Sequence, residues 1–331
     1  MPEATLAGEL LLACVDGGAS KTRAVVLTAT GEILATATVQ SASAYHREPE
    51  EAAGVVAVAI RTALDQAGRK GPVTALGAGL AGADTPFIHE RLVATLSGSG
   101  LARSVHVDHD AAAALAGGLA LEPGVVVIAG TGSMAFGTDA PGRRARAGGW
   151  GPLLDDEGSG YAIGRASLRA AMRHFDGRGP STSLAEAVCR RFGLDSLAAL
   201  KTAVRGISID QVAAVALVAL EAARAGDPVA TEILQRAATG LAAMVAAVAR
   251  ALGWDDVCFP LIAAGGVFEA GAQIVQPMTE ALRDQRCRAE WRPALLPPEV
   301  GAALLGARAA GHDTRSLIQR LTTRDTRGAA C

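Results

Sequence analysis

Two short segments rich in glycine and hydroxyl side chains carry the residue types that bind phosphate. The first reads VDGGASKTRAVVL, residues 15–27, and the second is the GTGS stretch at residues 130–133. Glycine lets a backbone approach a ligand closely, Ser and Thr hydroxyls donate hydrogen bonds, and a lysine offsets phosphate charge. Two such turns can present backbone N–H groups to a polyphosphate. The sequence therefore predicts phosphate binding.

The first segment does not match the Walker A loop. That loop requires G-x-x-x-x-G-K-[ST], with a glycine directly before the lysine, whereas Ser20 precedes Lys21 here. The segment also lies between the apolar, strand-like runs 10–15 and 23–29. Walker A and Rossmann loops lead from a strand directly into a helix. We therefore expect a phosphate turn between two antiparallel strands.

Carboxylates and further glycines supply the other candidate groups. Asp108 and Asp110 end the strand-like stretch SVHVDHD, directly before an alanine-rich helix. Residues 148–165, GGWGPLLDDEGSGYAIGR, form a glycine-rich segment with acidic residues that leads into a helix, as functional loops often do. The stretch AAGGVF, residues 263–268, is one more glycine turn after a strand.

The elements that must position these groups form two successive cycles of strands and helices. Residues 10–110 predict three strands joined by glycine turns, followed by a helix, a strand, a helix and a strand. Residues 124–137 repeat the arrangement of strand, glycine turn and strand. A mostly helical region, 165–254, and a strand with a glycine turn, 257–271, follow. The recurrence predicts two related halves.

Length and composition describe a soluble protein of two domains. The chain has 331 residues, more than one hydrophobic core usually serves, and half of them are hydrophobic. The net charge of -2 gives no basic surface for nucleic acid or for an anionic membrane. Arg143, Arg144 and Arg146 are too few for a polyanion site, and we expect them in a solvated loop.

The sequence also predicts a cytoplasmic location. No basic region precedes the short apolar segment near the N-terminus, and no run reaches the length of a membrane span. The cysteines have neither C-x-x-C spacing nor Cys/His ligand spacing, which argues against a zinc site, an iron–sulfur cluster or a disulfide framework. They are Cys14, Cys189, Cys258, Cys287 and Cys331.

The order of these motifs resembles the actin-like, sugar-kinase and Hsp70 ATPase superfamily. Within it, the chain resembles the N-acetylglucosamine kinase branch, which is related to BadF/BadG-type ATPases, over roughly residues 10–310. The most specific match is GGWG followed by DEGS within residues 148–159. The resemblance implies a two-domain actin-like (ribonuclease H-like) α/β fold with mixed sheets flanked by helices and a cleft between the domains.

The resemblance also implies a domain plan. We expect an N-terminal actin-like domain over residues 1–114, with a C-terminal helix at about 298–315 that packs back on it. Residues 115–297 are expected to form the second domain, with the sugar-binding loop and the nucleoside-binding helices. Residues 316–331 are expected to be a flexible tail, and the polar composition of residues 312–331 predicts a short helix before a disordered end.

The resemblance assigns the phosphate and metal contacts residue by residue. Asp16 matches the aspartate that holds Mg²⁺ through water, and Gly265 and Gly266 match the glycine pair that lies along the nucleoside. The residues that match the two phosphate turns are Asp16, Gly17, Gly18, Ser20, Lys21, Thr22, Gly130, Thr131, Gly132 and Ser133.

The sugar site follows in the same way. Asp110, directly before the alanine helix, matches the catalytic aspartate, although Asp108 shares its strand face and Asp110 could also serve as an N-cap. Gly148, Gly149 and Asp156, and less directly Glu157, match positions that hold sugar hydroxyls. We expect Trp150 to anchor this loop by burial.

The resemblance implies an ATP- and Mg²⁺-dependent kinase that phosphorylates the 6-hydroxyl of N-acetylglucosamine or glucosamine, as a homodimer. Asp110 would accept the hydroxyl proton. One departure concerns the substrate: residues 40–47, QSASAYHR, lack the asparagine that usually touches the sugar, so Ser43, Ala44, Tyr45 or His46 must take that place. The alternatives are a BadF-type ATPase activator and a non-catalytic sugar sensor.

Overall fold

The computed structural model describes residues 10–18, 21–45 and 47–328, within which the chain forms two compact units. The first unit comprises residues 1–122 and 293–331, and the second comprises residues 123–292. Each contains one five-stranded sheet. The boundary after residue 122 keeps helix α3 (Asp110–Gly118) whole, whereas the boundary expected at residue 114 would cut it.

The sheet of the first unit has the strand order β3-β2-β1-β4-β5. The first three strands pair antiparallel, as the sequence predicted, and β4 and β5 add to β1 in parallel. The strands are β1 (Leu11–Gly17), β2 (Lys21–Thr28), β3 (Ile33–Gln40), β4 (Val73–Leu80) and β5 (Ala102–Asp108).

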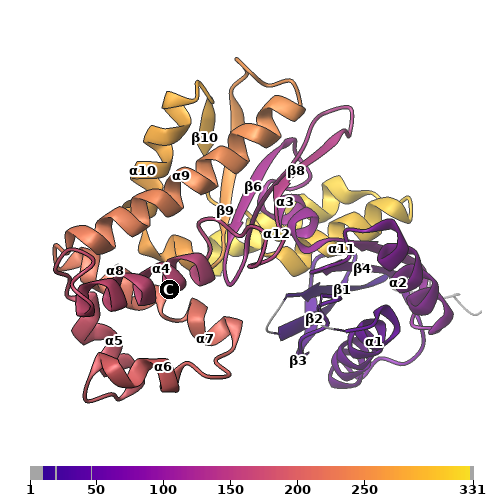
Figure 1. The fold of residues 1–331 in the computed structure, drawn as a ribbon. Coiled ribbons are helices and arrows are strands. Elements are labelled where there is room, and N and C mark those ends of the chain that lie inside the picture. Colours follow the sequence, from indigo (N-terminus) through magenta and orange to yellow (C-terminus); the bar gives the residue numbers. More distant parts are fainter. Residues whose placement is uncertain (1–9, 19–20, 46, 329–331) are drawn as a thin grey trace, which may run out of the picture. The chain divides into compact units, whose positions relative to one another are not determined.

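Helices cover both faces of this sheet (Figure 1). Helices α1 (Pro49–Gln66) and α2 (Pro86–Gly98) pack on one face, and α3 and α11 (Pro298–Ala309) pack on the other. Successive residues of β1 point to opposite faces, so Ala13 belongs to the core beneath α1, whereas Leu12 belongs to the core beneath α11. Burial on both sides fixes the end of β1, where Asp16 lies.

Helix α11 approaches its neighbours through glycine. A Cβ atom on Gly301 would lie 2.0 Å from Ala113 O of α3, and a Cβ atom on Gly77 of β4 would lie 1.8 Å from Ala302 O. Both distances are shorter than any real contact of a Cβ atom. The low aromatic content and the many small residues therefore reflect a core in which backbones nearly touch.

The C-terminal segment differs from the expected flexible tail. Residues Thr314–Gly328 form helix α12, and its Leu317 and Leu321 are buried in the core beneath α11. These two leucines are four residues apart, so they lie on one face of the helix. The sequence pattern missed this apolar pair because polar residues surround it.

The second unit repeats the topology of the first. Its strand order, β8-β7-β6-β9-β10, has three antiparallel strands followed by two parallel additions, which supports two related halves. The strands are β6 (Gly124–Ala129), β7 (Ser133–Thr138), β8 (Arg144–Gly148), β9 (Phe259–Ala264) and β10 (Ala289–Trp291).

The helical region predicted at residues 165–254 is confirmed, and helix α10, which was not predicted, follows it (Figure 1). Short 3₁₀ segments occupy Leu197–Ala199 and Gly266–Ala270. The α-helices are α4 (Gly160–Phe175), α5 (Leu184–Phe192), α6 (Leu200–Ala203), α7 (Ile209–Ala213), α8 (Ala216–Arg224), α9 (Pro228–Ala251) and α10 (Ala272–Asp284).

Helix α9 has the length and composition of a membrane span, contrary to the sequence-based prediction that no run reaches that length. In the structure 61% of its most apolar window is buried, and the helix packs on β6, β7, β8 and α10. This burial is typical of a core helix.

Two arginines of the cluster lie on a strand, whereas Arg143 lies in an exposed loop as expected. Arg144 and Arg146 belong to β8, whose residues pair with β7. The Arg144 guanidinium lies 4.9 Å from the centre of the Phe136 ring, so its side chain packs along the sheet. The strand was missed because charged residues hide its alternation.

Candidate functional site

The turn between β1 and β2 carries the first predicted phosphate segment. The Gly18 N–H donates to Lys21 O at 3.0 Å, and the Ser41 hydroxyl donates to Gly18 O at 2.9 Å. These bonds close the turn and fix it to the end of β3. Ser20, predicted to contact phosphate, lies outside the described residues.

Two residues of this segment have structural roles in the first unit. A Cβ atom on Gly17 would lie 2.6 Å from Leu80 Cδ2, so glycine is needed here for packing. Thr22 is fully buried, and its hydroxyl accepts the Ala42 N–H at 2.7 Å. Its side chain therefore holds the loop after β3, while Lys21 is exposed beside it.

Asp16 lies in a cluster of acidic groups. Burial, and then the negative charges of Asp110 and Glu299, raise the pKa of Asp16 to about 7 from an ordinary value of 3.8. Lys21 and Arg23 act in the opposite direction. The parallel register sets Gly79 of β4 opposite both Asp16 and Asp108, so the ends of β1 and of β5 lie at the same edge of the sheet.

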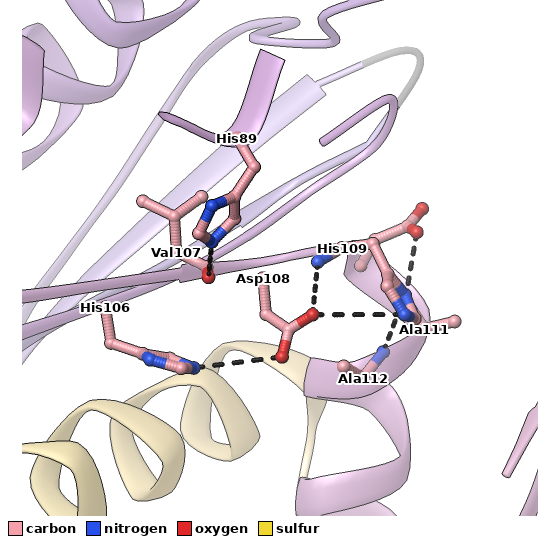
Figure 2. A network of polar contacts seen from close by, with 8 residues as sticks. His89, His106, Val107, Asp108, His109, Ala111 and Ala112 are labelled. Carbon is pink, nitrogen blue, oxygen red and sulfur yellow. Dashed lines mark hydrogen bonds and ion pairs between the residues drawn. The ribbon is translucent and has the colours of Figure 1, made fainter. Parts of the chain in front are cut away.

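Asp108 and Asp110 have different surroundings, although two residues separate them. Figure 2 shows the Asp108 carboxylate between the imidazoles of His106 and His109. Asp108 Oδ1 accepts the backbone N–H of His109 at 2.8 Å, and Asp108 Oδ2 lies 3.8 Å from the ring atom His106 Nε2. The alternation of β5 places His106 and Asp108 on the same side of the strand.

Asp110 is the first residue of α3, and His109 is its N-cap. The His109 Nδ1 accepts the Ala112 N–H at 3.1 Å (Figure 2), so His109, not Asp110, caps the helix. Asp110 Oδ1 accepts the Ala111 N–H at 2.9 Å. Burial raises the pKa of Asp110 to about 6.

The loop that lacks the expected asparagine is partly buried. Ser43 and Ala44 lie inside the first unit, and the Ala44 N–H donates to Ala81 O at 2.9 Å. Tyr45 is 58% exposed, and His46 lies outside the described residues. Of the described candidates in this loop, Tyr45 is the one whose side chain is accessible.

In the second unit, three glycine segments meet at one edge of the sheet. The parallel pairing of β6 with β9 sets Ile128 opposite Ala264, so the turns that follow both strands are adjacent. A Cβ atom on Gly265 would lie 2.4 Å from Ala129 O. The Gly160 N–H at the start of α4 donates to Gly130 O at 2.7 Å. The structure therefore brings the predicted GTGS turn and the Gly265–Gly266 pair together.

Asp156 joins the sugar loop to the GTGS turn. It is buried and has a φ of 64°, a left-handed conformation that few residues other than glycine adopt. Its Oδ1 accepts the Ser133 N–H at 3.4 Å, and a Cβ atom on Gly132 would lie 3.1 Å from its Oδ2. Burial raises the pKa of Asp156.

Gly148, Gly149 and Glu157 complete this assembly around Ser133. The Gly149 N–H donates to Ser133 O at 2.9 Å, and the Ser133 hydroxyl donates to Glu157 O at 2.7 Å. Gly148 has a φ of 78°, and a Cβ atom there would lie 2.6 Å from Met244 Sδ. The predicted phosphate turn and the predicted sugar loop are thus one hydrogen-bonded assembly within the second unit.

Two features near this assembly differ from the sequence prediction or were missed by it. Trp150 is 62% exposed, with the Arg146 guanidinium 4.6 Å from its ring centre, so it is not a buried anchor. The Thr131 hydroxyl donates to Asp210 Oδ1 at 2.9 Å. Nothing in the local sequence signals the Asp210 contact, because the partners are far apart along the chain.

The chemistry of Asp16 fits a metal held through water. No group of three or more His, Cys, Asp or Glu that could hold a metal ion occurs among the residues the structure describes. Mg²⁺ in nucleotide sites keeps several waters and uses one or two carboxylates together with phosphate oxygens. A nearby cation stabilises the ionised form of a buried carboxylate whose pKa is raised, and Asp16 is such a carboxylate.

Comparison with known proteins adds independent information. The BadF/BadG/BcrA/BcrD ATPase family matches residues 14–306. The chain is 33% identical over 256 residues to an N-acetylmuramic acid/N-acetylglucosamine kinase of Clostridium acetobutylicum, covering 76% of this chain and 84% of that protein. It is 31% identical over 308 residues to an N-acetyl-D-glucosamine kinase of Dictyostelium discoideum, covering 88% and 96%.

A solved structure agrees with these sequence matches. A candidate N-acetylglucosamine kinase from Chromobacterium violaceum superposes with a TM-score of 0.72 at 28% identity, covering 90% of this chain and 99% of that chain. The likeness confirms the predicted α/β fold of two actin-like domains with mixed sheets flanked by helices.

Proposed function

Because this chain belongs to the BadF/BadG/BcrA/BcrD ATPase family, we propose that it is an ATP-dependent amino-sugar kinase. The reaction transfers the γ-phosphoryl group of ATP to the 6-hydroxyl of N-acetylglucosamine or glucosamine. The observation that carries the proposal is the 31% identity, over 88% of this chain, to an N-acetyl-D-glucosamine kinase.

The two glycine turns are proposed to bind the phosphates of ATP. Gly18 and Lys21 act in the first unit, and Gly130, Thr131 and Gly132 act in the second. Phosphoryl transfer requires mainly positioning and stabilisation of developing negative charge, which backbone N–H groups and a lysine supply. The adjacency of Gly265 to the GTGS turn supports a nucleoside contact at Gly265 and Gly266.

Asp110 is proposed as the general base. Its carboxylate accepts the proton of the sugar 6-hydroxyl while that oxygen attacks the γ-phosphorus and ADP leaves. A base functions best when its pKa lies near the working pH, and a pKa of about 6 meets this condition. Asp108 is less suited, because a backbone N–H and two imidazoles surround its carboxylate.

Asp16 is proposed to hold Mg²⁺ through water. The ion, when bound, would neutralise charge on the phosphate oxygens. Asp16 itself orients the water shell, and its ionised form is the one that can do so. Its raised pKa makes this role dependent on pH.

The sugar hydroxyls are proposed to bind the Gly148–Gly149 backbone, Asp156 and Glu157. Sugars present vicinal hydroxyls, which pair well with carboxylate oxygens and backbone groups. In this structure Asp156 Oδ1 already accepts the Ser133 N–H, so the proposed sugar contact uses the remaining acceptor capacity of the carboxylate. Asp156 would then connect sugar binding to the position of the GTGS turn.

A panel of sugars tests the proposal. Purified protein with MgATP should form ADP in the presence of N-acetylglucosamine or glucosamine, and less with hexoses that lack a 2-amino group. N-acetylmuramate belongs in the panel because a relative is named for it. Absence of sugar-dependent ADP formation across the panel would contradict the kinase assignment.

A further inference from the structure

A carboxylate from helix α7, distant in the sequence, accepts a hydrogen bond from the threonine hydroxyl of the GTGS turn. Thr131 Oγ1 donates to Asp210 Oδ1 at 2.9 Å, across 79 positions of sequence. Both residues lie in the second unit. Asp210 is exposed on α7, so its side chain has room to turn away from Thr131.

Helix α4 connects these two residues. The Gly160 N–H of α4 donates to Gly130 O, directly before Thr131. A Cβ atom on Gly164 of α4 would lie 1.9 Å from Val212 O, so α7 packs directly on the backbone of α4. The reciprocal capping box of Ser208 and Gln211 fixes the start of α7. The Asp210 backbone is therefore held at a defined place beside the turn.

A hydroxyl carries one proton, and this limits what Thr131 can bind. A carboxylate and a phosphate oxygen both accept hydrogen bonds, so Thr131 can donate to Asp210 or to phosphate but not to both. The negative charge of Asp210 also opposes a phosphate at the same turn. Asp156 takes the neighbouring Ser133 N–H in a similar way, but it is buried and fixed, whereas Asp210 is accessible.

We propose that Asp210 is an internal competitor for the nucleotide, which occupies the Thr131 hydroxyl until a phosphate of ATP displaces it. The inference rests on the proposed function, because it takes the ATP phosphates as the competing anion. Through α7 and α4, the exchange connects nucleotide binding to the helical part of the second unit. Removing the competitor should strengthen nucleotide binding.

Binding of the non-hydrolysable analogue MgAMPPNP, measured by calorimetry without sugar, tests this inference. Asp210→Ala, which removes both charge and acceptor, should lower the dissociation constant about two- to fivefold, the range expected for one exposed charge interaction. Asp210→Asn keeps the shape and an acceptor oxygen, so its gain should be smaller. Asp195→Asn is the matched control, because Asp195 is an exposed aspartate of the same unit, and its affinity should equal that of the wild type.

A double-mutant cycle with Thr131→Val isolates the hydroxyl. If Asp210 acts through Thr131, Asp210→Ala should gain less affinity in the Thr131→Val background than in the wild type. Equal gains in both backgrounds would assign the effect to charge alone and overturn the inference. If the wild type binds MgAMPPNP and Asp210→Ala binds it with unchanged or weaker affinity, the inference is also overturned, but the proposed function is not. A wild type that binds no MgAMPPNP would overturn the proposed function itself, and this inference with it.

Discussion

At the scale of single residues, burial gives the carboxylates of this protein distinct chemistry. Asp16 lies near the end of strand β1 and Asp110 begins helix α3, and burial raises the pKa of both carboxyl groups. Asp156 has a raised pKa for the same reason and a left-handed backbone. Perturbed carboxylates of this kind are frequent at functional sites. Their environments therefore support the proposed division of roles.

Replacement of the proposed base separates binding from chemistry. Asp110→Asn should keep its affinity for MgAMPPNP and lose about 100-fold or more of kcat, because the amide cannot accept the hydroxyl proton. Steady-state kinetics and calorimetry measure the two quantities. Asp108→Asn is the comparison variant. If Asp108→Asn lost kcat in this way and Asp110→Asn did not, Asp108 would be the base.

The activity should depend on pH through Asp110. The base must be ionised, so kcat/KM should fall as the pH drops below about 6, the pKa of Asp110 in the free protein. The affinity for Mg²⁺ should begin to fall at a less acidic pH, as the pH drops below about 7, because protonation of Asp16 removes its negative charge. Initial rates from pH 5 to pH 8 at several Mg²⁺ concentrations measure both effects. A flat profile across this range would argue against ionisation of these groups.

Asp16 should also make stability depend on pH. Its pKa is higher in the folded chain than its ordinary value of 3.8, so the folded state keeps a proton that the unfolded state loses. The stabilisation is full below the ordinary pKa and is lost as the pH rises through about 7. Asp16→Asn should therefore raise Tm relative to the wild type at pH 8 and have little effect at pH 4. Calorimetric scans at both pH values test this, with the exposed Asp65→Asn as the control.

At the scale of elements, close packing through glycine fixes the helices that begin at the site. Helix α3 starts at Asp110, and α11 packs on it at Gly301. In the second unit, Gly164 of α4 allows the same close packing against Val212 of α7. Substitution of Gly301 or Gly164 by a larger residue should therefore displace the helices that carry Asp110 and Asp210, respectively.

Two glycine-to-alanine variants in helices of the first unit should act in opposite directions. Gly301→Ala places a methyl group against Ala113 O and should destabilise the fold by about 1–3 kcal/mol, the usual cost of overpacking. Gly54→Ala in α1 has no atom within 4 Å of its Cβ and should stabilise by about 0.5–1 kcal/mol through helix propensity. Urea unfolding of both variants measures the difference. Equal effects would mean that α11 has room to move away from α3.

The elements that could be predicted from the sequence are those with strong local signals. The antiparallel start, the helix expected after the third strand (α1) and the helical region of the second unit are confirmed. Strand β8 was missed because its charged residues hide the alternation of the strand. The C-terminal helix α12 is longer than the short helix expected there, and its two buried leucines were missed because they lie among polar residues. These outcomes depend on contacts that tertiary structure creates and that local pattern does not record.

In the candidate site, too, the local motifs could be predicted from the sequence, whereas the tertiary contacts could not. Glycine turns and aspartates were visible as motifs, but the direction of each side chain was not. Thr22 points into the core, Trp150 lies exposed, and His109 caps the helix that Asp110 begins. The contact of Thr131 with Asp210 joins distant segments and has no local signature.

At the scale of the whole molecule, the repeated topology of the two units accounts for the repeated glycine turns. Each sheet has three antiparallel strands and two parallel additions, and each carries a turn after its central strand.

We propose that the protein is cytoplasmic and acts as a homodimer. Sedimentation velocity at micromolar concentration should then give twice the 33.4 kDa mass of the chain. A single species at the mass of one chain would contradict the dimer.

The most direct measurement of the central claim is identification of the product. Wild-type protein, MgATP and N-acetylglucosamine should yield ADP and an equal amount of a sugar monophosphate, detected by mass spectrometry. Phosphorus–proton couplings in its NMR spectrum should place the phosphate on the 6-hydroxyl, and Asp110→Asn should form almost none. Formation of ADP without any phosphorylated amino sugar, or a phosphate on another hydroxyl, would contradict the account.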